Sequence, residues 1–195
     1  DTSKVTNMER MFGYAERFNQ PLNWDTSNVT NMKEMFFNAS SFDQALNFNT
    51  SNVTTMEDMF YQAKSFNQPL NFNTSKVVDM EGMFSYASSF DQAVNFDTSS
   101  VTNMDYMFYN AIEFNQPINF DISNIITMER MFCDADAFLD KYNSGKTLPN
   151  ETDSIKDWFN LNRDRMNEID LKDKYGDEID DFFSKFSNKE FSKEI

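Results

Sequence analysis

Residues 25–48 read DTSNVTNMKEMFFNASSFDQALNF, and variants of this 24-residue stretch fill most of the chain. The opening tripeptide returns every 24 residues, beginning at Asp1, Asp25, Asn49, Asn73, Asp97 and Asp121. Five full units cover residues 1–120, and a sixth extends from 121 to about 138. Self-similarity at a fixed period of about 20–50 residues is typical of proteins whose successive units stack on one another.

Two local patterns occur within each unit. The quoted unit, residues 25–48, has apolar residues at the spacing of one helix face: Met32, Met35, Phe36, Ala39 and Phe42. Thr54 and Glu57 of the next unit match a capping box, which would start such a helix. Residues 44–48 then alternate polar and apolar side chains, which predicts a strand with Leu46 and Phe48 facing inward. The repeats therefore predict an α/β solenoid of strand–turn–helix coils over residues 1–138.

Composition limits the classes of partner. The formal net charge is −15, and a surface this acidic repels phosphate backbones, so no nucleic-acid partner is expected. The same charge favours basic or divalent-cation partners. No apolar run approaches the roughly 20 residues that span a bilayer, which predicts no membrane insertion by these residues. Because the chain opens in mid-phase without a signal or anchor, we interpret it as a fragment whose targeting information lies upstream.

The repeat consensus V-T-x-M-x-x-M-F-x-x-A-x-x-F-[ND]-Q-[PA]-L-N-[FW] resembles that of the BspA-like leucine-rich-repeat surface proteins, which include repeat-rich mycoplasma surface lipoproteins. The resemblance covers residues 1–138. It implies a leucine-rich-repeat-like solenoid on a bacterial cell surface or in the extracellular space, with a role in adhesion or host interaction. The implied partner is a protein, and host extracellular proteins are one candidate class. The alternative is a structural display or spacer rod without a dedicated ligand.

Several rows of polar residues recur at equivalent positions. Stacked Gln20, Gln44, Gln68, Gln92 and Gln116 could form a ligand-reading strip, although we favour a structural role in satisfying turn backbone. The Asp or Asn that opens each unit could belong to a divalent-cation ladder, but Asx-turns explain the same row without metal. The chain has no His, so its single Cys133 has no Cys–His chemistry available. The sequence predicts no enzyme activity, no catalytic residue, no cofactor and no metal.

One row of aromatic residues is the candidate partner-binding site. Each of the first five units has an aromatic residue at repeat position 13 or 14: Tyr14, Phe37, Tyr61, Tyr86 and Tyr109. These positions lie away from the apolar face of the expected helix. Outward aromatic rings are the side chains that dominate protein-binding hot spots. The other interpretation is that the rings pack between neighbouring coils.

Residues 139–195 do not match the repeat. Helical apolar spacing occurs at 153–159 and again at 177–186. We expect this acidic segment to be a helical cap over the last coil, as stacked repeats require. A partner-docking helix or a membrane-surface helix is the alternative.

Overall fold

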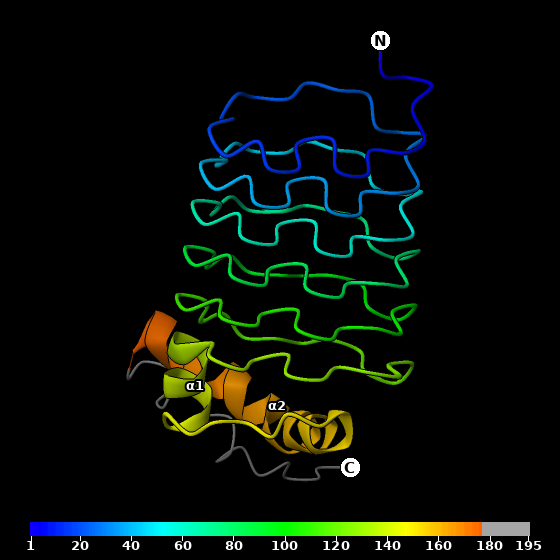
Figure 1. Cartoon of the computed structure of the whole chain (residues 1–195). Helices are drawn as coiled ribbons and strands as arrows, with labels where there is room; N and C mark the ends of the chain where they lie inside the picture. The colour runs from blue at the N-terminus through cyan, green and yellow to red at the C-terminus, as the bar shows by residue number, and fades with distance from the viewer. Residues whose placement is uncertain (177–195) are drawn as a thin grey trace, which may run out of the picture.

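The computed structural model describes residues 1–176, and its repeat region is a stack of coils, each coil being one 24-residue unit (Figure 1). The chain advances from the first coil to two helices at the opposite end, α1 (Asp136–Asn143) and α2 (Thr152–Tyr175). Isolated parallel bridges join equivalent residues of neighbouring coils, as between Asn31 and Thr55. The period of the sequence is therefore the period of the structure.

The predicted α/β solenoid of strand–turn–helix coils is wrong, and so is the leucine-rich-repeat-like architecture that the resemblance implied. Within residues 1–176, the only helices are α1 and α2, and no strand is formed. The segment expected to be helical, around 32–42, consists of successive turns. The segment 44–48 is extended and carries a single bridge, between Leu22 and Leu46.

The backbone hydrogen bonds explain why no helix forms. The N–H of Met59 donates to the carbonyl of Met56 in the same coil (3.1 Å), whereas that of Phe60 donates to Met83 in the next coil (2.9 Å). The same alternation recurs in the other coils. A helix needs each N–H to reach the carbonyl four residues back in its own segment. Because alternate donors go to a neighbouring coil, the helical ladder cannot propagate.

Left-handed backbone at two positions of each unit closes these turns. Repeat positions 10 and 14 have positive φ in all six coils: Arg10, Tyr14, Glu34, Asn38, Asp58, Gln62, Gly82, Tyr86, Tyr106, Asn110, Arg130 and Asp134. A residue in this region interrupts a right-handed helix. Successive tight turns still bring residues i, i+3, i+4 and i+7 to one side. The spacing that predicted a helix is thus produced by turns.

The core consists of columns of stacked phenylalanines. The rings of Phe36, Phe60 and Phe84 lie nearly parallel, with centroids 5.5 and 5.7 Å apart. A second column, which includes Phe66, packs against the first, and the Phe60–Phe66 centroids are 4.2 Å apart. The methionines of the turn segment, such as Met56 and Met59, fill the remaining interior. The predicted inward orientation of Leu46 and Phe48 is confirmed, because both side chains are buried.

The polar rows stabilise turns and contacts between coils. Asn49 Oδ1 accepts hydrogen bonds from the N–H and the hydroxyl of Ser51, which confirms the Asx-turn interpretation of the row that opens each unit. The Gln row has a structural role, but its partners differ from those expected. Gln68 Nε2 donates to Asp43 Oδ1 of the preceding coil (2.9 Å), and not to another glutamine. Asp43 also accepts the N–H of Asn67, so one side chain fixes two groups.

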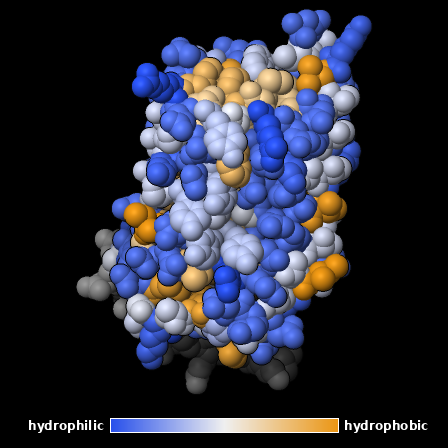
Figure 2. All heavy atoms as spheres, in the orientation of Figure 1, coloured by the Kyte–Doolittle hydropathy of each residue, from blue (hydrophilic) through white to orange (hydrophobic). Residues whose placement is uncertain are grey.

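The two ends of the stack differ. At the C-terminal end, α2 crosses the last coil (Figure 1), where Phe159 packs on Phe132 and Thr152 Oγ1 accepts the N–H of Met128 (3.0 Å). The helix expected at 153–159 is confirmed within α2, and the one expected at 177–186 lies outside the described residues. At the N-terminal end, apolar atoms remain on the surface (Figure 2), and Phe12 is only partly buried. Neither described helix is both long and apolar enough to cross a membrane.

The stack predicts that equivalent core substitutions differ in cost with their position. Phe60→Ala removes a fully buried ring stacked on both sides, and we expect a loss of about 3–5 kcal/mol in the free energy of unfolding. Phe12→Ala, in the first coil, should cost less, about 1–2 kcal/mol, because that ring is only partly buried, whereas Phe60 is fully buried. Urea denaturation of both variants measures the difference. Equal losses would contradict a stack of interdependent coils.

Candidate functional site

The five predicted aromatic residues form one continuous row on the surface, which we call the aromatic strip: Tyr14, Phe37, Tyr61, Tyr86 and Tyr109. Successive ring centroids are 5.3, 4.6, 5.6 and 5.3 Å apart. Tyr14 is exposed, and the other four rings are half-buried. The rings therefore pack against one another, as the structural interpretation held, and also remain accessible, as a binding role requires.

The turns place these rings on the surface. In three coils the aromatic residue is at position 13, but coils one and four have the small residues Gly13 and Ser85 there. In those coils the ring is supplied by position 14, which has positive φ, 62° at Tyr14 and 56° at Tyr86. Positions 13 and 14 both lie within the turn that runs from position 12 to position 15, so the row continues despite the shift by one residue.

An acidic edge runs beside the aromatic strip. Repeat position 9 carries Glu9, Lys33, Glu57, Glu81, Asp105 and Glu129 in successive coils. Lys33 Nζ is bound by the Glu57 carboxylate (2.6 Å), and the Arg10 guanidinium makes two hydrogen bonds to Glu34 (2.5 and 2.9 Å). The cations of this edge are thus neutralised within the first three coils, whereas Glu81 and Asp105 of the fourth and fifth coils form no ion pair with a described residue.

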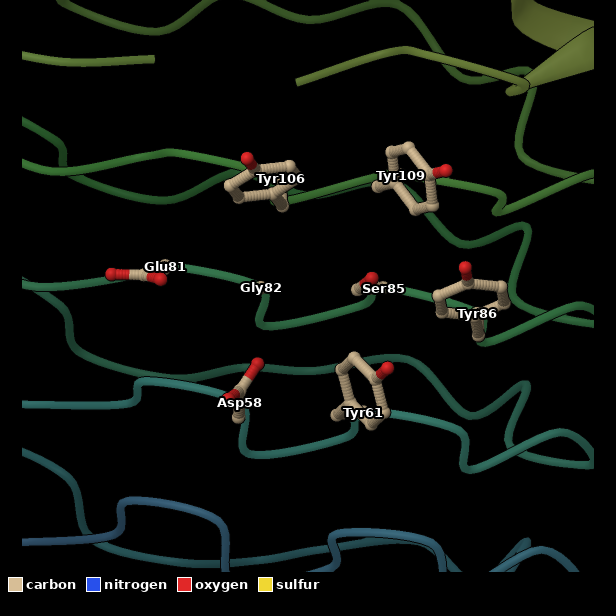
Figure 3. Close-up of a pocket in the computed structure, with 8 residues that line it drawn as sticks. All are labelled: Asp58, Tyr61, Glu81, Gly82, Ser85, Tyr86, Tyr106 and Tyr109. Carbon is tan, nitrogen blue, oxygen red and sulfur yellow. The ribbon is translucent and has the colours of Figure 1, made fainter. Parts of the chain in front are cut away.

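A pocket of about 280 Å³ opens where the strip meets this edge (Figure 3). The third, fourth and fifth coils line this pocket. The third coil contributes Asp58 and Tyr61, the fourth contributes Glu81, Gly82, Ser85 and Tyr86, and the fifth contributes Tyr106 and Tyr109. Gly82 makes room for the carboxylate, because a Cβ at this glycine would lie 2.0 Å from Asp58 Oδ1. Every other coil has a side chain at this position.

The Asp58 carboxylate is electrostatically unusual. Burial raises the pKa of Asp58 to about 7, and the nearby carboxylates of Glu57, Glu81 and Glu34 add to the increase. Lys33 opposes the increase, but its ammonium group is bound to Glu57. No described side chain donates a hydrogen bond to the Asp58 carboxylate. A cation in the pocket would supply the missing partner.

The strip itself was found from the sequence, but the pocket was not. The candidate site predicted from the sequence consisted of the aromatic row alone, without Asp58, Glu81, Gly82, Ser85 or Tyr106. One feature of the sequence does indicate the pocket. Gly82 is the only glycine among the six residues at position 10, and the equivalent residue of the preceding coil is the carboxylate Asp58. Cys133 lies outside the strip, and burial raises the pKa of its thiol, which disfavours the reactive thiolate.

The stacked coils, the phenylalanine columns and the surface strip together define a tandem-repeat protein built on a 24-residue period. The chain belongs to the family described as "Mycoplasma protein of unknown function, DUF285", which matches residues 1–72 and 69–171. The chain matches none of the curated proteins and none of the solved structures with which it was compared. The resemblance to BspA-like proteins is supported only as far as this mycoplasma repeat family.

The raised pKa of Asp58 predicts a pH-dependent stability. A carboxyl group with a higher pKa in the folded than in the unfolded state stabilises the protein at low pH, and that contribution is lost as pH rises from about 4 to about 7. Asp58→Asn removes the ionisation. We expect the variant to be more stable than the wild type by about 1–2 kcal/mol at pH 8, a value reduced for partial solvent exposure. Urea denaturation at several pH values measures the difference.

The comparison contains its own control. At about pH 3, below the ordinary aspartate pKa of 3.8, Asp58 is protonated in both the folded and the unfolded protein, so the variant and the wild type should differ little. A constant difference at both pH values would show that the substitution acts through packing instead of charge. Glu81→Gln should shift the wild-type pH dependence to lower pH by removing one of the nearby carboxylates.

Proposed function

We propose that this chain is a non-catalytic protein-binding module that acts on the cell surface or after secretion, and that the aromatic strip is its contact face. The observation that carries the proposal is the continuous row of accessible rings beside an acidic edge. Tyrosines supply large contact areas with little conformational entropy to lose, which makes them frequent in binding hot spots. A rigid stack holds them in one line before a partner arrives.

Charge favours a basic partner. The chain carries a formal net charge of −15, and Glu81, Asp105 and Glu129 lie along the acidic edge of the later coils. Complementary charge accelerates association and makes it sensitive to salt. Extracellular-matrix proteins with basic segments have this complementarity. The membership of a mycoplasma repeat family and the resemblance to surface proteins support the proposed location.

A display or spacer rod is the second candidate. It is favoured by the packing of each ring on its neighbours, since rings that mainly cover the turns would need no ligand. The two functions differ in what happens when rings are removed. A binding face loses affinity while the fold persists, whereas a covering layer loses stability.

Removing two central rings tests the choice. We expect Tyr61→Ala combined with Tyr86→Ala to weaken binding to immobilised basic matrix proteins by about 2–4 kcal/mol, because both rings lie at the centre of the strip. The melting temperature should fall much less than after loss of a core ring such as Phe60, since Tyr61 and Tyr86 are partly exposed. Surface plasmon resonance against a panel of matrix and serum proteins measures the affinities.

Tyr175→Ala is the matched control, because this exposed tyrosine lies on α2 away from the strip. It should bind the panel as the wild type does. If the double variant melts early and binds normally when folded, the rings are a packing layer and the display rod is the better account. Labelling of intact cells with an antibody to the repeats tests the location, and signal only after permeabilisation would contradict it.

A further inference from the structure

We propose that the pocket over Gly82 is a binding site for an organic cation with N–H donors, namely a lysine or arginine side chain of the partner protein. This inference deepens the proposed function in naming the partner group, but the choice of a cation rests on the pocket itself. Its lining combines two carboxylates, Asp58 and Glu81, with the rings of four tyrosines. Carboxylates accept N–H donors, and aromatic faces attract a nearby cation through their quadrupole.

The first two coils show how this stack treats a carboxylate at position 10. Glu34 occupies position 10 of the second coil and is bound in a two-bond contact by the guanidinium of Arg10, at position 10 of the first. This pair joins position 10 of two neighbouring coils, with the cation in the coil before the carboxylate, whereas the pocket lies on the side of the coil after Asp58. The chain therefore already contains a cation bound to a position-10 carboxylate by a neighbouring coil.

Asp58 is the next carboxylate in the same column, and its neighbours there supply no cation. Glu34 precedes it and is bound by Arg10, while Gly82 follows it and has no side chain. Figure 3 shows the Asp58 carboxylate directed toward the coil of Gly82. In the fifth coil, position 10 is Tyr106, which supplies a ring to the pocket instead of a long charged side chain. Position 10 thus leaves the Asp58 carboxylate without a cation like the one that Arg10 supplies to Glu34.

The dimensions and the shape of the pocket fit a side-chain cation. A volume of about 280 Å³ is enough for an alkylammonium or guanidinium group and part of its aliphatic stem, but is small for a folded segment. The tyrosines from three coils form its walls: Tyr61, Tyr86, Tyr106 and Tyr109. Since the pocket lies within the aromatic strip, a partner covering the strip would place a basic side chain directly above it.

Binding of a cation should also be coupled to protonation. The groups that face Asp58 are the carboxylates of Glu34, Glu57 and Glu81 and the ammonium of Lys33. A bound cation favours the ionised form of Asp58, so binding should release a proton near pH 7. Affinity should therefore fall as pH decreases from 8 to 6.

Small probes test the site without the natural partner. We expect N-acetyl-lysine amide and N-acetyl-arginine amide to bind the wild type with dissociation constants of roughly 1 mM, measured by NMR titration. N-acetyl-norleucine amide, which has the same stem as lysine without its charge, should not bind. Choline distinguishes a lipid headgroup from a protein side chain, and choline binding tighter than both amino-acid amides would overturn the assignment to a protein cation.

Two variants locate the binding. Asp58→Asn should weaken binding of the lysine probe by about tenfold or more, since a charge-assisted hydrogen bond is lost. Tyr106→Leu keeps apolar bulk but removes a ring, and should also weaken binding of both cationic probes. Asp91→Asn is the control, because Asn19 and Asn67 already accept the same hydrogen bonds elsewhere in that column. Binding that survives Asp58→Asn, or the absence of saturable binding by either cationic probe, would overturn the proposal.

The outcomes also separate the two proposals. If the lysine probe binds but Tyr61→Ala with Tyr86→Ala leaves binding to the protein panel unchanged, the pocket stands and the strip is not the contact face. If the panel result is as expected and the probes do not bind, the strip stands and this assignment of the pocket fails.

Discussion

Backbone hydrogen bonds between coils are the constraint on which the remaining structure depends. The N–H of Phe60 reaches the carbonyl of Met83, 23 residues ahead, and equivalent bonds recur along the stack. They place each residue over its counterpart 24 positions away. The phenylalanine columns, the contact between Arg10 and Glu34, and the aromatic strip all follow from this register. A single coil cannot form these bonds, so its conformation depends on its neighbours.

The sequence predicted the relations between coils better than the structure within a coil. Periodicity alone identifies which residues become neighbours, so the aromatic row and the Asx-turns could be predicted without knowing the local backbone. The absence of a helix could not be predicted, because successive tight turns reproduce the helical spacing of Met32, Met35 and Phe36. Position 14 did indicate an interruption of the helix, because Asn and Asp tolerate the left-handed backbone that stops a helix. Three coils have such a residue there: Asn38, Asn110 and Asp134.

The candidate site depends on residues that vary from coil to coil, whereas the scaffold depends on residues that repeat. Residues that repeat from coil to coil build the scaffold. Phe60 stacks on its equivalents, and Thr74, whose position is Thr in the first five coils, donates a partly buried hydrogen bond to the carbonyl of Asp97 in the next coil. The pocket arises where coils depart from the repeat, at Asp58, Gly82 and Tyr106. Their combination could not be predicted from the repeat consensus, because its significance depends on the burial of one carboxylate against a glycine. Burial and nearby charge together then raise the pKa of Asp58 to about 7.

Deletion of one coil tests the 24-residue register most directly. Removing residues 73–96 should leave a cooperatively folded protein, because the remaining coils can stack in the same register. Its urea m-value should be lower than that of the full chain, since less surface is buried. Removing residues 73–84 should abolish cooperative unfolding, because half a period places turn segments over extended ones. Equal tolerance of both deletions, or unfolding by both, would contradict the account.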